Sequence, residues 1–163
     1  MKENVYLRPA RRDDLQTVYR LYRSSVGREG CAWDEVYPGK FELDQDFSGR
    51  NLYVLTDDAV VLGAVSVVDP PELTGENIWS TDSFAEIARV VVEESVSGQG
   101  YASYMLRELF FILKERGIDS IRLSVSLGNP AALRLYQKLG FRFLKRKALY
   151  GGEYFLCEKL LTE

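Results

Sequence analysis

The stretch that decides the fold is "VVVEESVSGQGYASYMLREL", which runs from Val90 to Leu109. A run of valines leads into a serine-rich segment that contains Gly98 and Gly100, after which apolar residues recur at helical spacing. This pattern predicts a strand, a glycine turn and a helix in direct succession. Such a turn points free backbone N–H groups and the positive end of the helix dipole outward, so it suits an anion such as a phosphate.

Two common phosphate-binding motifs do not match this turn. A Walker A loop requires a lysine after the second glycine, whereas here Tyr101 and Ala102 follow Gly100. A Rossmann fingerprint requires an acidic residue at the end of the next strand, where this chain has "LSVSLGN", residues 123–129. By itself the glycine turn is a weak signal, and a turn of purely structural importance explains it equally well.

The size and composition indicate one globular domain over residues 1–163, with 46% hydrophobic and 28% charged residues. No apolar run approaches the roughly 20 residues of a membrane span, and the first residues do not form a secretory signal. We therefore expect a cytoplasmic protein without a membrane partner. The chain contains no histidine, which removes imidazole bases, the usual catalytic triads and most transition-metal sites.

Charge and cysteine content exclude further classes of protein. The net charge is -3 and no basic stripe is present, so nucleic acid is not an expected partner. Cys31 and Cys157 lie far apart and form no C-x-x-C motif, which argues against a disulfide framework or a zinc site. We expect no metal, and Cys157 is predicted to be a small core residue.

Hydrophobic periodicity and turn residues predict a mixed α/β order of elements. Strands are expected over 5–10, 84–92 and 119–129, and helices over 11–27, 40–47, 100–116 and 130–140. Antiparallel hairpins are expected over 51–69 and 141–161, with turns at Thr56-Asp57-Asp58 and at Gly151-Gly152. The sheet therefore changes from hairpins to a β-α-β crossover near its fourth and fifth strands, and it needs helices on both faces.

A second motif, "NPAALRLYQKLGFR" over 129–142, strengthens the functional interpretation of the glycine turn. Together the two motifs resemble those of the GCN5-related N-acetyltransferase (GNAT) family. The matching positions are Gly98 and Gly100 in the first motif, and Asn129, Ala132, Leu135, Tyr136, Gly140 and Phe141 in the second. Ser95 and Ser97 depart from the family pattern, because members carry Gln or Arg at the first position and commonly arginine at the second. Both departures weaken side-chain contacts to phosphate but leave the backbone N–H groups in place.

The resemblance implies a central mixed sheet of about seven strands, splayed between the fourth and fifth strands, with helices on both faces. It also implies acetyl-CoA as co-substrate. The pyrophosphate would be held by backbone N–H groups of Val96, Ser97, Gly98, Gln99, Gly100, Tyr101 and Ala102. The pantetheine arm would bond to the backbone of Val90, Val91 and Val92, and the N–H of Val91 or Val92 would stabilise the oxyanion formed on attack.

The resemblance places a general acid at Tyr136 and a contact with the cofactor at Asn129. Tyr136 would return a proton to the departing thiolate, although an aromatic residue on an amphipathic helix is also typical of a core. Asn129 would serve as helix cap as well, and capping alone is an equally good explanation. Glu86 is the candidate base, because some members carry a glutamate on this strand and partial burial would raise its pKa. Alternatively, Glu86 is a solvated edge residue or a partner for an arginine. Asp82, Tyr37 and Glu35 are further candidates for the base.

The acceptor pocket is expected in the first helical region and its loop, where Trp33, Glu35 and Tyr37 lie near Glu29 and Asp34. Carboxylates and aromatic rings suit a cationic amine, on a small molecule or on a peptide. A non-catalytic acyl-CoA-binding module and a nucleotide-binding protein stay open as alternatives. Homodimers are common in the family, and the final hairpin is a candidate edge for one.

Overall fold

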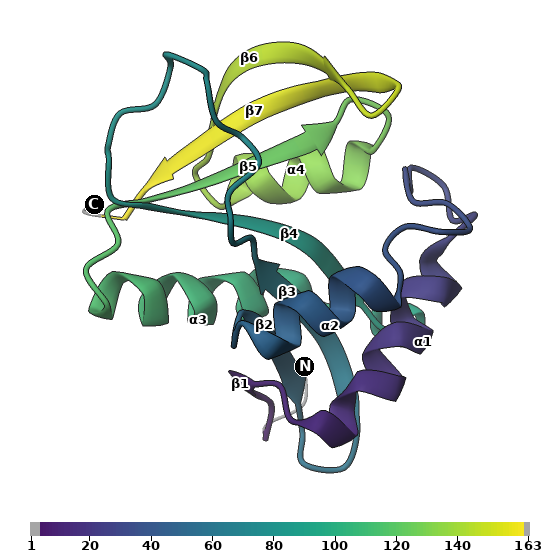
Figure 1. Cartoon of the computed structure of the whole chain (residues 1–163). Helices are drawn as coiled ribbons and strands as arrows, with labels where there is room; N and C mark the ends of the chain where they lie inside the picture. The colour runs from purple at the N-terminus through teal and green to yellow at the C-terminus, as the bar shows by residue number, and fades with distance from the viewer. Residues whose placement is uncertain (1–3, 162–163) are drawn as a thin grey trace.

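The computed structural model describes residues 4–161 and contains one seven-stranded sheet with the strand order β1-β2-β3-β4-β5-β7-β6 (Figure 1). Neighbouring strands are antiparallel except β4 and β5, which are parallel. The strands are β1 (Tyr6–Pro9), β2 (Leu52–Thr56), β3 (Val61–Val67), β4 (Phe84–Val92), β5 (Ser120–Ser126), β6 (Arg142–Leu149) and β7 (Gly152–Leu160). The helices are α1 (Leu15–Ser25), α2 (Lys40–Ser48), α3 (Tyr101–Glu115) and α4 (Pro130–Lys138). The predicted mixed α/β fold and its order of elements are confirmed.

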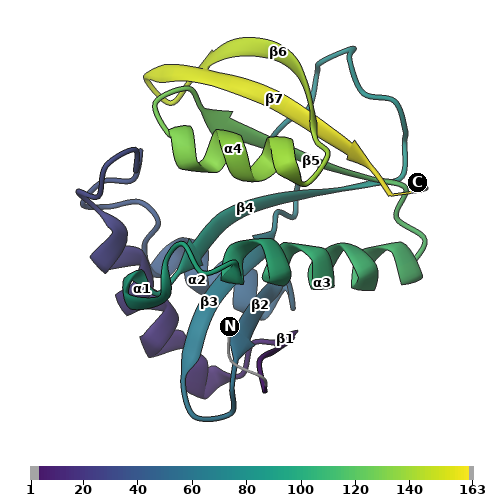
Figure 2. The same cartoon turned by 180° about the vertical axis from the view of Figure 1, so that it is seen from behind.

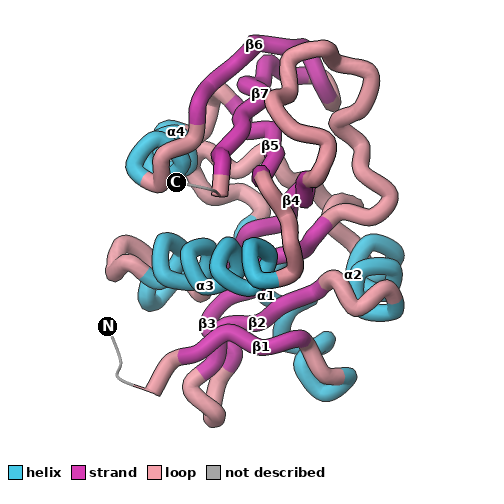
Figure 3. Tube along the Cα trace, turned by 90° about the vertical axis from the view of Figure 1, so that its left-hand side faces the viewer, coloured by secondary structure: helices cyan, strands magenta, loops and turns pink. Residues whose placement is uncertain are grey.

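Helices cover both faces of the sheet. Figure 1 shows α1 and α2 in front of β2 and β3, and the opposite view in Figure 2 shows α3 and α4 on the other face. The side view in Figure 3 separates the two layers. Met105, Leu106 and Leu109 of α3 are fully buried on one side, and Leu21 and Tyr22 of α1 are fully buried on the other. The helical periodicity of these apolar positions is what directs one face of each helix onto the sheet.

A long loop, residues 68–83, takes the place of a helix over part of the α2 side (Figure 1). It covers polar residues of the sheet: the guanidinium of Arg122 donates to the Thr81 carbonyl at 2.7 Å, and the Ser80 N–H donates to Glu158 at 2.9 Å. Glu158 is fully buried and Arg122 is only 6% exposed. The loop therefore supplies the hydrogen-bond partners that buried charged groups require.

The sheet splays between β4 and β5, as predicted. Pairing between them covers only three residue pairs, from Phe84 with Ser120 to Glu86 with Arg122. Beyond Glu86, β4 stays paired with β3, while β5 stays paired with β7 along its whole length. Figure 2 shows the two strands diverging from this point. We call the gap between residues 87–92 of β4 and 123–126 of β5 the wedge.

The structure also contains a β-bulge in β4. The register with β3 shifts between Ala64, which faces Val91, and Ser66, which faces Ala88. Arg89 lies in the extra segment with φ of 54°, in the left-handed region that non-glycine residues seldom adopt. Strain of this kind persists only where surrounding contacts hold it.

None of the helices within residues 4–161 has both the length and the apolar character needed to cross a lipid bilayer.

Candidate active site

The glycine turn presents a set of free donors at the start of α3. Gly98 and Gly100 have φ of 77° and 88°, which explains why glycine stands at both positions. Within residues 4–161, the backbone N–H groups of Gly98, Gln99, Gly100, Ala102 and Ser103 have no acceptor. The Ser103 hydroxyl oxygen is buried and also lacks a partner there. This donor set fits an anionic group such as a diphosphate.

Fewer backbone N–H groups of the glycine turn are free in the structure than the sequence predicts. The N–H groups of Val96 and Ser97 already donate to the carbonyls of Glu93 and Glu94, at 3.1 and 3.0 Å, within a short 3-10 turn (Glu94–Val96). In this conformation their N–H groups are already engaged and are not free to donate to a ligand. Tyr101 begins the helix, and its ring is 2% exposed in the core. Gln99 and Gly100 stay exposed at the surface of the turn.

Strand pairing identifies which backbone groups of β4 face the wedge. The Glu93 N–H donates to the Leu62 carbonyl of β3 at 2.8 Å, so the polar backbone groups of Glu93 point toward β3. Because these groups alternate along an antiparallel strand, those of Val91 point to β3 and those of Val92 point to the wedge. Val90 lies within the bulge, where this alternation is interrupted, so its orientation does not follow from it. Of the two oxyanion donors proposed from sequence, Val92 therefore has the better orientation.

Tyr136 and Asn129 lie on the other side of the wedge, in α4 and at its start. Asn129 accepts a hydrogen bond from the Ala132 N–H at 3.1 Å and so caps α4. Tyr136 is 8% exposed, and its ring meets Phe141 edge-on at 5.5 Å. Burial raises the pKa of the Tyr136 phenol, with a smaller contribution from Cys157. The phenol therefore keeps its proton at neutral pH, and its hydroxyl has no hydrogen-bond partner within the described residues.

Glu86 lies at the point where β4 and β5 part. It is 4% exposed, and its Oε1 accepts hydrogen bonds from the N–H groups of Glu72 and Leu73 at 2.9 and 2.8 Å. Burial raises the pKa of the Glu86 carboxyl, and the two backbone donors oppose this shift. The carboxylate thus anchors the 68–83 loop through Oε1, while Oε2 has no hydrogen-bond partner among residues 4–161. Its burial argues against a solvated edge residue. Among residues 4–161 Glu86 forms no direct ion pair with an arginine, although the charge of Arg122 lowers its pKa slightly.

A buried network that the sequence reasoning missed lies beside the bulge. The Arg89 guanidinium forms two hydrogen bonds with Asp46 of α2, at 2.8 and 2.9 Å, and a third with the Tyr37 hydroxyl at 3.0 Å. Ser66 donates to the same carboxylate at 2.6 Å. Burial is the largest single effect and lowers the pKa of Arg89, but the hydrogen bonds and charge interactions with Asp46 and Tyr37 together raise it above its usual value, so the guanidinium stays charged. Like Glu86, Arg89 is a charged residue in an apolar strand, and this pattern is visible in the sequence.

Of the three predicted acceptor residues, the network includes Tyr37 alone. Tyr37 is 39% exposed, so its ring is open to a ligand while its hydroxyl is held by Arg89. Trp33 packs edge-on against Tyr22 at 5.6 Å and belongs to the packing beneath α1. Glu35 is exposed, and its carbonyl rather than its carboxylate is engaged, by Arg23 at 2.6 Å.

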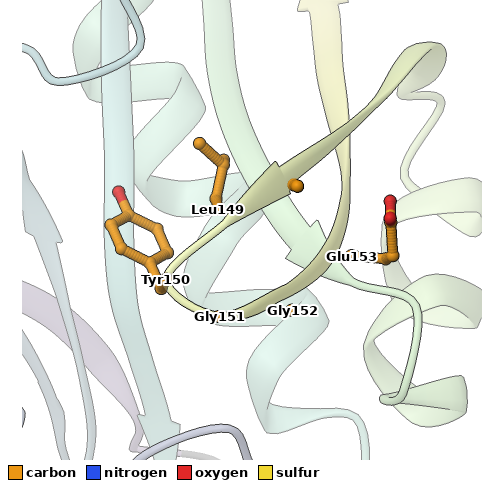
Figure 4. Close-up of a pocket in the computed structure, with 6 residues that line it drawn as sticks. Leu149, Tyr150, Gly151, Gly152 and Glu153 are labelled. Atoms are coloured by element: carbon orange, nitrogen blue, oxygen red, sulfur yellow. The ribbon is translucent and has the colours of Figure 1, made fainter.

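The β6–β7 turn adds groups that were not predicted. A depression of about 300 Å³ is lined by residues 148–153, and Figure 4 shows Tyr150 and Glu153 on opposite sides of this turn. The Tyr150 hydroxyl donates to Glu72 at 3.1 Å, and the Tyr150 ring meets Tyr154 edge-on at 5.6 Å. Because Glu72 also donates its N–H to Glu86, the turn is linked to the point where the wedge begins.

Comparison with known proteins identifies the same family. The model of the acetyltransferase (GNAT) family matches residues 15–141. YwnH of Bacillus subtilis (strain 168), named a candidate phosphinothricin acetyltransferase, is 27% identical over 83% of this chain and 82% of its own length. A GNAT-family acetyltransferase from Streptococcus agalactiae 2603 superposes with a TM-score of 0.81 at 18% identity, covering 96% of this chain and 95% of that one. The structure of yncA from Salmonella typhimurium, described with its cofactor acetyl-CoA, has a TM-score of 0.77 at 20% identity, covering 99% of this chain and 96% of that one.

Proposed function

Because the chain belongs to the acetyltransferase (GNAT) family, we propose that it transfers the acetyl group of acetyl-CoA to a primary amine of a small molecule or peptide. The amine attacks directly while both substrates are bound. One observation carries this proposal: pairing between β4 and β5 stops at Glu86, so the wedge begins where a buried carboxylate lies. Acetyl-CoA, when bound, supplies the activated thioester.

The chain's own groups suit the binding of this cofactor. The diphosphate would be held by the free N–H groups of Gly98, Gln99, Gly100, Ala102 and Ser103, and the backbone groups of Val90 and Val92 would bond to the amides of the pantetheine arm. The Val92 N–H also stabilises negative charge that develops on a carbonyl oxygen in the wedge. None of these contacts depends on a particular side chain.

Two side chains then move protons. Glu86, with its raised pKa, takes a proton from the incoming ammonium group through water, using the oxygen that does not anchor the loop. Tyr136 holds its proton until the thiolate leaves and then donates it. Burial raises the pKa of Cys157 to about 12, so this thiol is not a nucleophile, which favours direct attack over a covalent intermediate.

Release of the CoA thiol tests the proposal. The wild type is expected to release thiol with at least one member of a panel of amines, and Tyr136→Phe should be slower with the same amine. If no amine supports turnover although CoA binds with micromolar affinity, the chain is a non-catalytic acyl-CoA-binding module. Competition of ATP with acetyl-CoA checks the remaining alternative, a nucleotide-binding protein.

A further inference from the structure

The segment that follows α1 crosses the open end of the wedge. Gly27, with φ of 90°, turns the chain at the end of α1 so that Arg28 reaches β4, where its Nη1 lies 3.5 Å from the Val92 carbonyl. A Cβ on Gly30 would lie 3.1 Å from Oδ1 and 3.2 Å from Cα of Asn129, so Gly30 packs directly on the start of α4. Residues 28–30, which we call the strap, therefore contact the elements on both sides of the wedge.

The Arg28 guanidinium is poorly satisfied for a largely buried cation. Its side chain is 26% exposed, and its two contacts, with the Val92 carbonyl and with the Glu94 carboxylate, are both 3.5 Å long. Its Nε and Nη2 atoms are buried without a hydrogen-bond partner within residues 4–161, and Nε has only the 3.5 Å contact with the Glu94 carboxylate. Because buried donors of a charged group are costly to leave unpaired, this arrangement fits an anionic ligand group.

The glycine turn contains no cationic side chain that could pair with a diphosphate. Residues 93–103 contain two carboxylates, Glu93 and Glu94, and no lysine or arginine. Ser95 and Ser97 stand where a cationic side chain would be expected for phosphate binding. The cations nearest to these carboxylates come from the α1 side of the chain, where Arg20 lies 3.5 Å from Glu93 and Arg28 lies 3.5 Å from Glu94.

We infer that Arg28 is the cationic side chain for the cofactor's diphosphate, supplied by the strap instead of by the glycine turn. This inference rests on the proposed use of acetyl-CoA. Arg28 is the better placed of the two arginines, because it also touches the wedge-facing carbonyl of Val92, whereas the Arg20 side chain is 57% exposed. The guanidinium offsets the charge of Glu94 and offers its unpaired N–H groups to phosphate oxygens.

Calorimetric titration with CoA tests the inference independently of turnover. Arg28→Met, which keeps side-chain length but not charge, should bind CoA at least about tenfold more weakly than the wild type. Arg28→Lys should recover part of the affinity. Arg20→Met is the matched control and should change the affinity by about twofold or less, because exposed ion pairs contribute little.

Two further measurements separate the explanations. Pantetheine, which lacks the diphosphate, should bind the wild type and Arg28→Met equally, and an equal loss for both ligands would overturn the inference. Arg28→Met should also weaken CoA binding in a Glu94→Gln background; without that loss, Arg28 only neutralises Glu94 and the inference is wrong. If the wild type binds no CoA, the proposed function fails, whereas if Arg28→Met binds CoA as tightly as the wild type, this inference alone fails. A raised KM for the amine with unchanged CoA affinity would place Arg28 at the acceptor and would also overturn it.

Discussion

The buried pair of Asp46 and Arg89 gives the sharpest prediction for stability. Both side chains are 6% exposed, and the pair is joined by two hydrogen bonds of 2.8 and 2.9 Å. Asp46→Asn keeps the shape of the side chain and an acceptor oxygen, but it leaves the Arg89 charge uncompensated in the interior. Such a change typically costs about 3–5 kcal/mol, because the desolvated charge loses its partner.

This cost is large relative to the total stability of an ordinary domain, which is about 5–15 kcal/mol. For a denaturant dependence of about 2 kcal/mol per molar, the urea midpoint of Asp46→Asn should fall by roughly 1.5–2.5 M. Equilibrium unfolding in urea, followed by fluorescence, measures the shift. Arg20→Met, which removes the exposed pair with Glu93, should lose less than about 1 kcal/mol.

A double-mutant cycle isolates the charge as the cause. In the Asp46→Asn background, Arg89→Met should cost little or should restore stability, because the uncompensated charge has been removed. Additive losses from the two substitutions, or a loss below about 1 kcal/mol for Asp46→Asn alone, would show that the buried pair does not stabilise the fold.

Three further variants test the site. Tyr136→Phe should lower kcat by about 100-fold or more while leaving CoA affinity unchanged; an unchanged kcat would show that the ring serves only the core. Glu86→Gln keeps an acceptor for the loop N–H groups but cannot take a proton. The raised pKa of Glu86 means that wild-type kcat/KM should rise with pH through a value above that of an exposed glutamate, and this rise should vanish in Glu86→Gln. Gly98→Ala should destabilise the fold by about 1 kcal/mol through its positive φ and should also weaken CoA binding. Gly75→Ala has a similar φ of 82° away from the site, so it should cost stability alone, and equal effects on CoA binding would contradict the role of the turn.

The arrangement of elements could be predicted because local patterns determine it. The apolar run "FAEIARVVV" matches β4 residue for residue. Asn129 caps the start of α4, and Gly117 follows the end of α3 with a positive φ, as these residue types predict. The splay between β4 and β5 was predicted from the family motifs and not from hydrophobic periodicity, because the periodicity of a strand does not show whether it is paired with its neighbour. Cys157 is fully buried, as its place in an apolar strand indicates.

The contacts that shape the site could not be predicted in the same way. Arg28 and Val92 are separated by 64 residues, and nothing in "VGREGC" indicates which strand the arginine meets. The backbone groups of Val92, and not those of Val91, face the wedge because of the register between β4 and β3. The sequence of β4 alone does not contain this register. Likewise, the polar composition of residues 68–83 predicts a loop. Its hydrogen bonds with Glu158 and Arg122 could not be predicted, because they depend on the folded sheet.

The bulge at Arg89 also limits how the length of this segment can vary. Arg89 and Val90 both lie opposite Val65 of β3, so deleting one of them would remove the bulge and change the backbone that holds the Arg89 guanidinium against Asp46. Val92 is proposed to act through its backbone groups, so its side chain can be exchanged more readily than the number of residues in this segment can change. Insertions and deletions in related chains are therefore expected outside 86–92, in segments such as the 68–83 loop.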